Sequence, residues 1–265
     1  MDFNGDWIVI TGASSGLGKE IALQLAERHN SNLILVARRE NKLKEIQNTI
    51  QRTTSAQVEI LVADLCRTTD NQKLLALCLS RNNLAGVILN AGITYFGEHT
   101  EITEDRLDAI IDLNINSNTF LISHLTKHYS KTTKDFRLMV VSSMAANFPV
   151  SYQALYSGTK GFVTNFANAL SHEIDNDRFM LSVFSPGGIK TEMTSGKEFE
   201  KLEKHLMSVS AVAKEGIKCF NSNKYNHIPG TLNKIGNYFL QLLPSKPIAS
   251  LLAKNYRKSL KSSQR

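Results

Sequence analysis

The sequence predicts an α/β fold in which a doubly wound parallel sheet is covered by helices on both faces. Six short runs rich in Val, Ile and Leu alternate with longer stretches of helical periodicity. Strands that alternate with helices favour a parallel sheet, because each crossover places a helix on one of the two faces. No internal repeat and no Pro/Gly-rich linker divides the chain, so we expect one domain over residues 1–265.

The individual elements follow from the apolar pattern and from helix start signals. The expected strands are WIVI, LILVA, VEILVA, GVILN, FRLMVV and FMLSVF. Helical periodicity covers residues 16–29, 40–52, 68–82, 101–130 and 154–176. Thr68 and Thr103 are of a type that caps helix N-termini, which supports two of these starts.

Composition bounds the class of protein. A hydrophobic content of 42% is typical of a globular chain. No apolar run reaches about 18 residues and the first residues, MDFNGDW, lack the pattern of a signal peptide, so we expect a cytoplasmic protein. Three cysteines, Cys66, Cys78 and Cys219, show no metal-ligand spacing, which predicts reduced thiols and no metal site.

The formal charge of +7 is concentrated at the C-terminal end. Residues 221–265 hold eight Lys/Arg and no Asp/Glu, which leaves 23 of the 31 basic residues and all 24 acidic residues in the rest of the chain. A uniformly basic face would favour phosphate-backbone binding. A confined basic segment does not, so no nucleic-acid partner is expected.

A glycine-rich segment, ITGASSGLG at residues 10–18, lies between the first expected strand and the first expected helix. Glycines there let the backbone turn tightly, admit a pyrophosphate close to the chain and direct helix N-terminal amides toward negative charge. Alone, the pattern also fits a simple tight turn. Together with the features below it favours a Rossmann-type dinucleotide site, with cofactor contacts from Gly12, Ser14, Ser15, Gly16, Leu17 and Gly18.

The second expected strand ends in Ala37, Arg38 and Arg39. An acidic residue at this place suits the ribose of NAD, whereas arginine suits the extra phosphate of NADP. Arginine also binds phosphate bidentately. Arg38 and Arg39 therefore predict that NADP(H) is preferred over NAD(H).

Two further strand ends fit a cofactor that lies across the carboxyl edge of the sheet. Asp64 can accept a hydrogen bond from the adenine amino group, and Leu65 follows it. The segment NAG brings backbone close to the adenosine half of the cofactor. We expect contacts from Asp64, Leu65, Asn90, Ala91 and Gly92.

Groups suited to proton transfer occur on the fifth predicted helix and just before it. Tyr156 and Lys160 are four residues apart and so lie on one helix face. The ammonium is expected to lower the pKa of the phenol from about 10 and make Tyr156 a usable proton donor. Ser143, at the end of FRLMVV, can hydrogen-bond a substrate oxygen. Surface helices often carry Y-x-x-x-K without a role, so the prediction depends on the combination.

The chain resembles the short-chain dehydrogenase/reductase family from residue 6 to about residue 195. TGASSGLG, NAG, SSMAA, YSGTK and PGGIKT occur in the order and spacing of that family. Ser143 rather than Ser142 has the family's interval of thirteen residues to the tyrosine. The "ARR" after the second strand resembles an NADP-linked subgroup. Gly158 and Thr159 depart from the family's usual alanine and serine.

The resemblance also implies roles that the residues alone do not. Asn114 would organise a water chain that leads from Lys160, and Lys160 would hold the nicotinamide ribose. The carboxamide of the nicotinamide would be bordered by Pro186, Gly187, Ile189 and Thr191. Residues 192–215 would form a lid that closes over the substrate.

The C-terminal residues 231–260 form a basic amphipathic extension in sequence. Helical spacing relates Leu232, Ile235, Tyr238, Phe239, Leu242 and Leu243, and after two prolines Ile248, Leu251, Leu252 and Tyr256. Such a segment can pack on the enzyme's own core, on a second subunit or on an anionic membrane surface. The first two are preferred, and peripheral membrane contact stays an alternative.

These features predict an enzyme that reduces a ketone or aldehyde with NADPH, reversibly as an alcohol dehydrogenase. The expected substrate is a small carbonyl or alcohol compound, with lipophilic compounds as a guess, and a homo-oligomer is expected. Alternatives are a non-catalytic NADP-binding sensor, a membrane-associated interaction protein and an epimerase. His124 and His128 lack a third metal ligand, and G-A-S-S-G lacks the context of a hydrolase elbow.

Overall fold

Seven parallel strands form one sheet in the computed structural model, which describes residues 3–195, 206–222 and 224–263. The strands are β1 (Trp7–Thr11), β2 (Asn32–Ala37), β3 (Val58–Val62), β4 (Leu84–Leu89), β5 (Phe136–Val141), β6 (Phe179–Phe184) and β7 (Asn226–His227). Their order in the sheet is β3-β2-β1-β4-β5-β6-β7. The predicted doubly wound parallel sheet is therefore confirmed, and its order reverses between β1 and β4.

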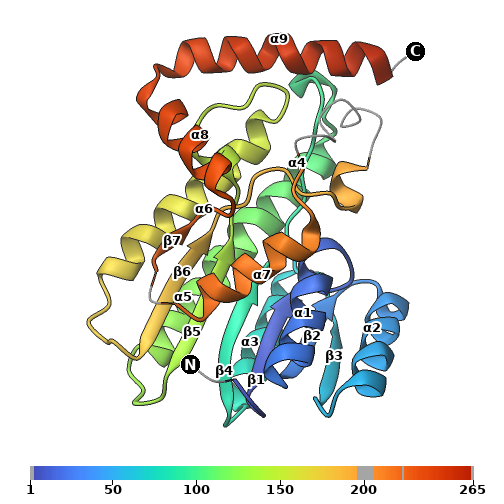
Figure 1. Ribbon diagram of the computed structural model, residues 1–265, viewed down its shortest axis with the longest axis vertical. Helices are drawn as coiled ribbons and strands as arrows, with labels where there is room; N and C mark the ends of the chain where they lie inside the picture. Colours follow the sequence, from blue (N-terminus) through green and yellow to red (C-terminus); the bar gives the residue numbers. More distant parts are fainter. Residues whose placement is uncertain (1–2, 196–205, 223, 264–265) are drawn as a thin grey trace.

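Helices cover both faces of the sheet (Figure 1). The helices are α1 (Gly16–His29), α2 (Glu40–Thr53), α3 (Thr68–Ser80), α4 (Glu104–Ile111), α5 (Asn118–Tyr129), α6 (Ala154–His172), α7 (Val209–Phe220), α8 (Thr231–Leu242) and α9 (Ser245–Ser263). Short 3-10 helices are η1 (His99–Glu101), η3 (Met144–Asn147) and η4 (Glu192–Thr194), and η2 (Asp112–Ser117) is π-helical. None of the described helices is both long enough and apolar enough to cross a membrane.

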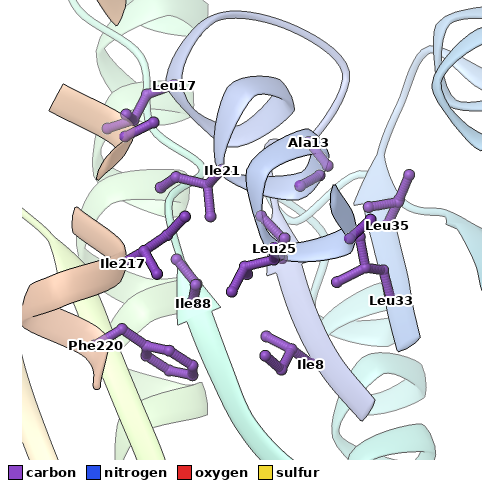
Figure 2. Close-up of a cluster of buried hydrophobic side chains, with 14 of the residues drawn as sticks. Ile8, Ala13, Leu17, Ile21, Leu25, Leu33, Leu35, Ile88, Ile217 and Phe220 are labelled. Atoms are coloured by element: carbon purple, nitrogen blue, oxygen red, sulfur yellow. The ribbon is translucent and has the colours of Figure 1, made fainter. Parts of the chain in front are cut away.

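Alternate side chains of each central strand enter two separate hydrophobic clusters. Ile8 and Ile10 of β1 pack with α1, α2 and α7, as the close-up in Figure 2 shows for the α1 side. Trp7 and Val9 pack on the opposite face with α3, α5 and α6. Every residue of β1 is buried, which is why the strand is an uninterrupted apolar run rather than an alternating one.

The helix expected over residues 101–130 is interrupted by the π-helical η2. Thr103 caps α4 as predicted, because its hydroxyl accepts a hydrogen bond from the backbone N–H of Arg106. Thr68 does not cap α3: it is the first helical residue, and Arg67 occupies the N-cap position without a side-chain hydrogen bond.

The sequence analysis did not identify α7, which packs against α1. Ile217 and Phe220 of α7 are almost fully buried, and the centres of the Phe220 and Phe3 rings lie 5.2 Å apart. The lid expected over residues 192–215 overlaps the first half of this helix, and its residues 196–205 lie outside the described residues. The helical patterns at 232–243 and 248–256 form α8 and α9.

Phe220→Ala should lower the free energy of unfolding by about 3–5 kcal/mol, because it leaves a cavity between α7, Phe3 and the sheet. Chemical denaturation followed by circular dichroism measures this loss. Leu79→Ala, at a residue that is 41% exposed on α3, is the matched control and should change stability by less than about 1 kcal/mol. Equal losses in the two variants would contradict the packing of α7.

Candidate active site

A cavity of about 560 Å³ lies at the carboxyl ends of the central strands. Its walls come from the segments that follow β1, β2, β3, β4, β5 and β6, together with α6 and the C-terminal helices. Of the predicted site residues, those that line it are Gly12, Ser14, Ser15, Gly16, Leu17, Arg38, Arg39, Asp64, Leu65, Asn90, Ala91, Gly92, Ser143, Tyr156, Lys160, Pro186, Gly187, Ile189 and Thr191. Gly18 and Asn114 lie behind the wall. The individual roles of these residues stay predictions.

The glycine turn between β1 and α1 needs its three glycines because a side chain would disfavour the backbone conformation or clash with the end of β4. Gly12 and Gly16 have φ angles of 66° and 53°, which side chains disfavour. A Cβ on Gly12 would lie 2.9 Å from the Cα of Ala91, and one on Gly18 would lie 2.5 Å from Nδ2 of Asn90. The turn is therefore pressed against the end of β4, with the N-terminus of α1 beside the cavity.

Hydrogen bonds join the ends of β1 and β4 at the floor of the cavity. The Thr11 hydroxyl accepts hydrogen bonds from the backbone N–H groups of Asn90 and Ala91, each at 3.0 Å. Asn90 Nδ2 donates to the carbonyl oxygens of Thr11 and Gly12 at 3.0 and 3.3 Å. The Asn90 side chain is thus committed to holding the glycine turn.

Arg39 reaches across the cavity mouth. Its guanidinium donates to the hydroxyls of Ser14 and Ser15, with the shortest distance, 2.7 Å, to Ser15. It also forms an ion pair of 3.1 Å with Glu192, in the segment after β6. The hydrogen bond from Arg39 lowers the pKa of Glu192. Sequence analysis placed Glu192 only within the expected lid and did not identify its pairing with Arg39, because no local signal relates residues 153 positions apart.

The end of β3 is organised by backbone hydrogen bonds to carboxylates. The N–H of Asp64 donates to Asp70, at the start of α3, over 2.9 Å, and Asp64 Oδ1 accepts from the N–H of Cys66 over 3.2 Å. These bonds fix the turn that presents Asp64 and Leu65 to the cavity.

Ser143 and Tyr156 meet at the cavity wall. Burial raises the pKa of Tyr156, and the hydrogen bond between its hydroxyl and that of Ser143 partly opposes the shift. Ser143 Oγ also accepts from the N–H of Ala145. The neighbouring Ser142 is buried, and its hydroxyl donates to the carbonyl of Lys160. The structure therefore brings Ser143, and not Ser142, to the tyrosine.

Lys160 is buried behind the tyrosine. Its Nζ donates to the carbonyl oxygen of Val141 over 2.9 Å and lies 5.9 Å from the centre of the Tyr156 ring. Burial lowers the pKa of Lys160 to about 8. The sequence-based expectation that Lys160 lowers the pKa of Tyr156 is not met, because desolvation dominates at the phenol and the opposing effect comes from Ser143.

Asn114 lies within η2 and has no exposed surface. Its side chain pairs with both backbone groups of Ile93, at 3.0 and 2.9 Å, and donates to Thr159 Oγ1 over 3.1 Å. The backbone carbonyl of Asn114 accepts a hydrogen bond from the side chain of Asn118. A Cβ on Gly92 would lie 3.3 Å from Asn114 Oδ1 and 3.2 Å from Lys160 Nζ. Asn114 thus holds the segment after β4 against Lys160, and its role in proton supply stays a prediction.

The segment after β6 closes the side of the cavity next to Ser143. The carbonyl of Pro186 accepts a hydrogen bond from the N–H of Met144 over 2.9 Å. A Cβ on Gly16 would lie 3.3 Å from Cγ2 of Thr191, so this segment also reaches the glycine turn.

The remaining cavity wall consists of residues that sequence analysis did not name as site residues, although Leu206 lies within the range expected to form the lid. They are mostly apolar and include Met144, Phe148, Val150, Gln153, Leu206, Asn233 and Tyr256. Asn233 belongs to α8 and Tyr256 to α9, so the two C-terminal helices form part of the cavity wall. The hydroxyls of Ser143 and Tyr156, with the ammonium of Lys160 behind them, can bind the oxygen of an organic molecule and give it a proton. The apolar wall can contact the rest of that molecule.

Comparison with known proteins gives one family. A model described as "short chain dehydrogenase" matches residues 6–201. The 17-beta-hydroxysteroid dehydrogenase type 3 of Mus musculus is 34% identical over 192 residues, which are 72% of this chain and 62% of the mouse protein. Less than two thirds of that relative is therefore matched. The hydroxynaphthalene reductase-like protein Arp2 of Metarhizium anisopliae is 31% identical over 191 residues, 71% of this chain and 70% of that protein.

Solved structures share the fold. A short-chain dehydrogenase from Sphingobium yanoikuyae in complex with NADPH has a TM-score of 0.79 at 22% identity, over 90% of this chain and 96% of that chain. A short chain dehydrogenase/reductase from Burkholderia phymatum in complex with NAD has a TM-score of 0.80 at 16% identity, over 90% and 93% of the two chains. Both nicotinamide cofactors occur among these neighbours.

Lys160→Met should raise the free energy of unfolding by about 2 kcal/mol at pH 7. The lowered pKa means that the charge costs about 3 kcal/mol more in the folded than in the unfolded chain, and methionine loses the hydrogen bond to the Val141 carbonyl, worth about 1 kcal/mol. Between pH 8 and the ordinary pKa of 10.5 the unfolded chain holds a proton that folded Lys160 has released, so the wild type gains stability with rising pH across that window. The advantage of the variant is therefore full below pH 8 and lost by pH 10.5.

Urea denaturation at several pH values checks this dependence, with Lys127→Met at an exposed position of α5 as the control. A Lys160→Met variant that is less stable than the wild type at pH 7 would contradict the cost assigned to the buried ammonium.

Proposed function

The chain belongs to the short-chain dehydrogenase family, an oxidoreductase family, and from that premise we propose that it reduces a ketone or aldehyde with NADPH. The observation that carries the proposal is the pairing of Tyr156 with Ser143 in front of the buried Lys160. The same groups would serve alcohol oxidation in reverse.

The residues present fit a bound dinucleotide. The close packing at Gly12 and Gly18 leaves no room for a Cβ, so the backbone at the N-terminus of α1 lies close to the cavity, and a pyrophosphate suits amide groups at a helix N-terminus. Arg38 and Arg39 would hold a phosphate on the adenosine ribose, and Lys160 would hold the nicotinamide ribose. When bound there, the nicotinamide supplies the hydride that reduces the carbonyl carbon.

Tyr156 supplies the proton in the proposed reaction. Because burial raises its pKa, the phenol is protonated at neutral pH and can donate to the carbonyl oxygen as negative charge develops there. The hydrogen bond between Ser143 and Tyr156 places the two hydroxyls together, so that both can bind one substrate oxygen. Alcohol oxidation would need the phenolate and should therefore be favoured at higher pH.

Lys160 provides charge and position. With a pKa of about 8 it is mostly protonated at neutral pH. One of its three donors is used by the Val141 carbonyl, which fixes the ammonium beside Gly92. The other donors suit ribose hydroxyls and a water that replenishes the proton on Tyr156.

The substrate we propose is a lipophilic carbonyl compound with a bulky ring or chain. The cavity that Tyr156 lines is also lined by the apolar side chains of Phe148, Val150 and Leu206. The names of the two relatives, a hydroxysteroid dehydrogenase and a hydroxynaphthalene reductase-like protein, refer to compounds with fused rings. A panel of cyclic and long-chain ketones, with oxidation of NADPH followed at its absorbance, tests the class.

Tyr156→Phe should lower kcat about 10²–10⁴-fold, the usual contribution of a general acid, and leave NADPH binding within a few-fold of the wild type. Steady-state turnover and cofactor titration by fluorescence measure the two effects. Near-normal turnover in this variant would exclude Tyr156 as proton donor. The same variant serves as the blank in the substrate panel.

Replacing both Arg38 and Arg39 by Ala should weaken NADPH binding about 10–100-fold and NADH binding by less than about threefold, because charge-assisted hydrogen bonds to the extra phosphate are lost.

Glu192→Gln should have the opposite effect, since it releases Arg39 from the ion pair, and should tighten NADPH binding up to about fivefold. Isothermal titration with both cofactors measures these changes. Equal losses for NADPH and NADH in the double variant would contradict the phosphate assignment.

A further inference from the structure

Helix α8 turns a polar side toward the protein. Asn237 is 5% exposed and its Oδ1 accepts a hydrogen bond from Asn147 over 2.9 Å. Asn233 lines the cavity, and its Nδ2 donates to the Met207 sulfur over 3.1 Å as well as to the carbonyl of Pro229 four residues earlier. Gly236 and Leu240 complete this side and are half-buried. The helix is thus attached mainly through two asparagines.

The opposite side of α8 is apolar and exposed. Leu232, Phe239 and Leu242 are 86%, 62% and 65% exposed, and their spacing places them on one helix face. Among the described residues with large exposed hydrophobic side chains, seven of eleven fall between positions 232 and 251. We call this set the C-terminal apolar face: Leu232, Ile235, Tyr238, Phe239, Leu242, Leu243 and Leu251. Such a concentration of exposed apolar side chains marks an interaction site.

Helix α9 fixes the orientation of this face. Figure 1 shows α9 lying across the end of the molecule, with α8 running from one of its ends back toward the sheet. Ile248 of α9 is buried, and the Tyr256 ring packs against Phe96 at 5.1 Å. Ser151 donates a hydrogen bond to the carbonyl of Ala249. The C-terminal apolar face is therefore held in place and not a frayed end.

The charge around the face is positive. Lys234, Lys246 and Lys254 are exposed on α8 and α9. The segment 221–265 to which they belong contains eight basic residues and no acidic residue. An amphipathic helix with lysines beside an apolar face suits the interface of an anionic bilayer, where the apolar side chains enter the acyl boundary and the ammonium groups meet the headgroups.

We propose that the C-terminal apolar face docks the protein onto an anionic lipid bilayer. A second copy of the chain is the other occupant to consider. In a symmetric dimer the same patch faces itself, so the two net-positive segments would be brought together and would repel each other. Anionic headgroups carry the complementary charge, and this decides between the two.

Docking would also place the substrate end of the cavity at the bilayer. Asn233 and Tyr256 line the cavity from the same two helices that carry the apolar face. A lipid-soluble substrate could then enter without crossing bulk water. This last step rests on the proposed function, whereas the docking itself does not.

Flotation of the full chain with vesicles tests the docking without cofactor or substrate. We expect the protein to float with vesicles of phosphatidylcholine and phosphatidylglycerol, to float poorly with phosphatidylcholine alone, and to be released by salt. The double variant L232S/F239S and the triple variant K234E/K246E/K254E should each reduce binding at least about tenfold. These positions are exposed, so folding should be retained, and circular dichroism verifies it.

Matched controls carry the same changes on other faces. F162S removes an exposed aromatic side chain from α6, and K127E/K131E/K214E reverses three exposed lysines elsewhere. Both should bind vesicles like the wild type. Full-chain protein that stays unbound with anionic vesicles would overturn the proposal. So would L232S/F239S binding as well as the wild type, or a loss of self-association in that variant, seen by sedimentation, with vesicle binding unchanged.

Discussion

The hydrogen bonds between Thr11 and Asn90 join the two strands between which the sheet order reverses. Helices leave β1 and β4 toward opposite faces, so a crevice opens beyond these strand ends. The Thr11 hydroxyl and the Asn90 amide satisfy backbone groups that would otherwise be unpaired at the floor of this crevice. The glycine turn and the segment after β4 both depend on this junction.

The groups that serve the proposed chemistry lower the stability of the folded protein. A buried ammonium and a desolvated phenol are each unfavourable alone, and the surrounding core of β1, β4 and β5 holds them together. The Val141 carbonyl and the Ser143 hydroxyl compensate only in part. The result is an ammonium with a pKa lowered to about 8 beside a phenol that stays protonated, an arrangement suited to giving a proton to an oxygen.

Sequence reasoning succeeded where a feature is local or periodic. The strand runs and the glycine turn are set by contacts within a few residues, and the family motifs gave the strand ends that line the cavity. It could not identify the Arg39–Glu192 ion pair or the helix α7, because these depend on which distant segments meet in space. It also assigned the change in the pKa of Tyr156 to Lys160, since spacing reveals proximity on a helix but not desolvation. In α8 the helical period was right, but the apolar side proved to be the outer one, because Asn237 and Asn233 make the polar contacts with Asn147 and Met207.

The π-helical turn η2 limits how this chain can vary in length. A π turn accommodates an extra residue within a helix without breaking it. Deleting one residue of η2 would let the segment relax to a regular α-helix with α5 still facing the core, because the π turn is where the extra residue is taken up. A deletion within α4 or α5 would instead rotate the residues on one side of it by about 100° around the helix axis. After a deletion at the start of α5, Leu121 and Leu125, now buried, would turn away from the core. Single-residue changes of length are therefore absorbed within η2 and not in the flanking helices.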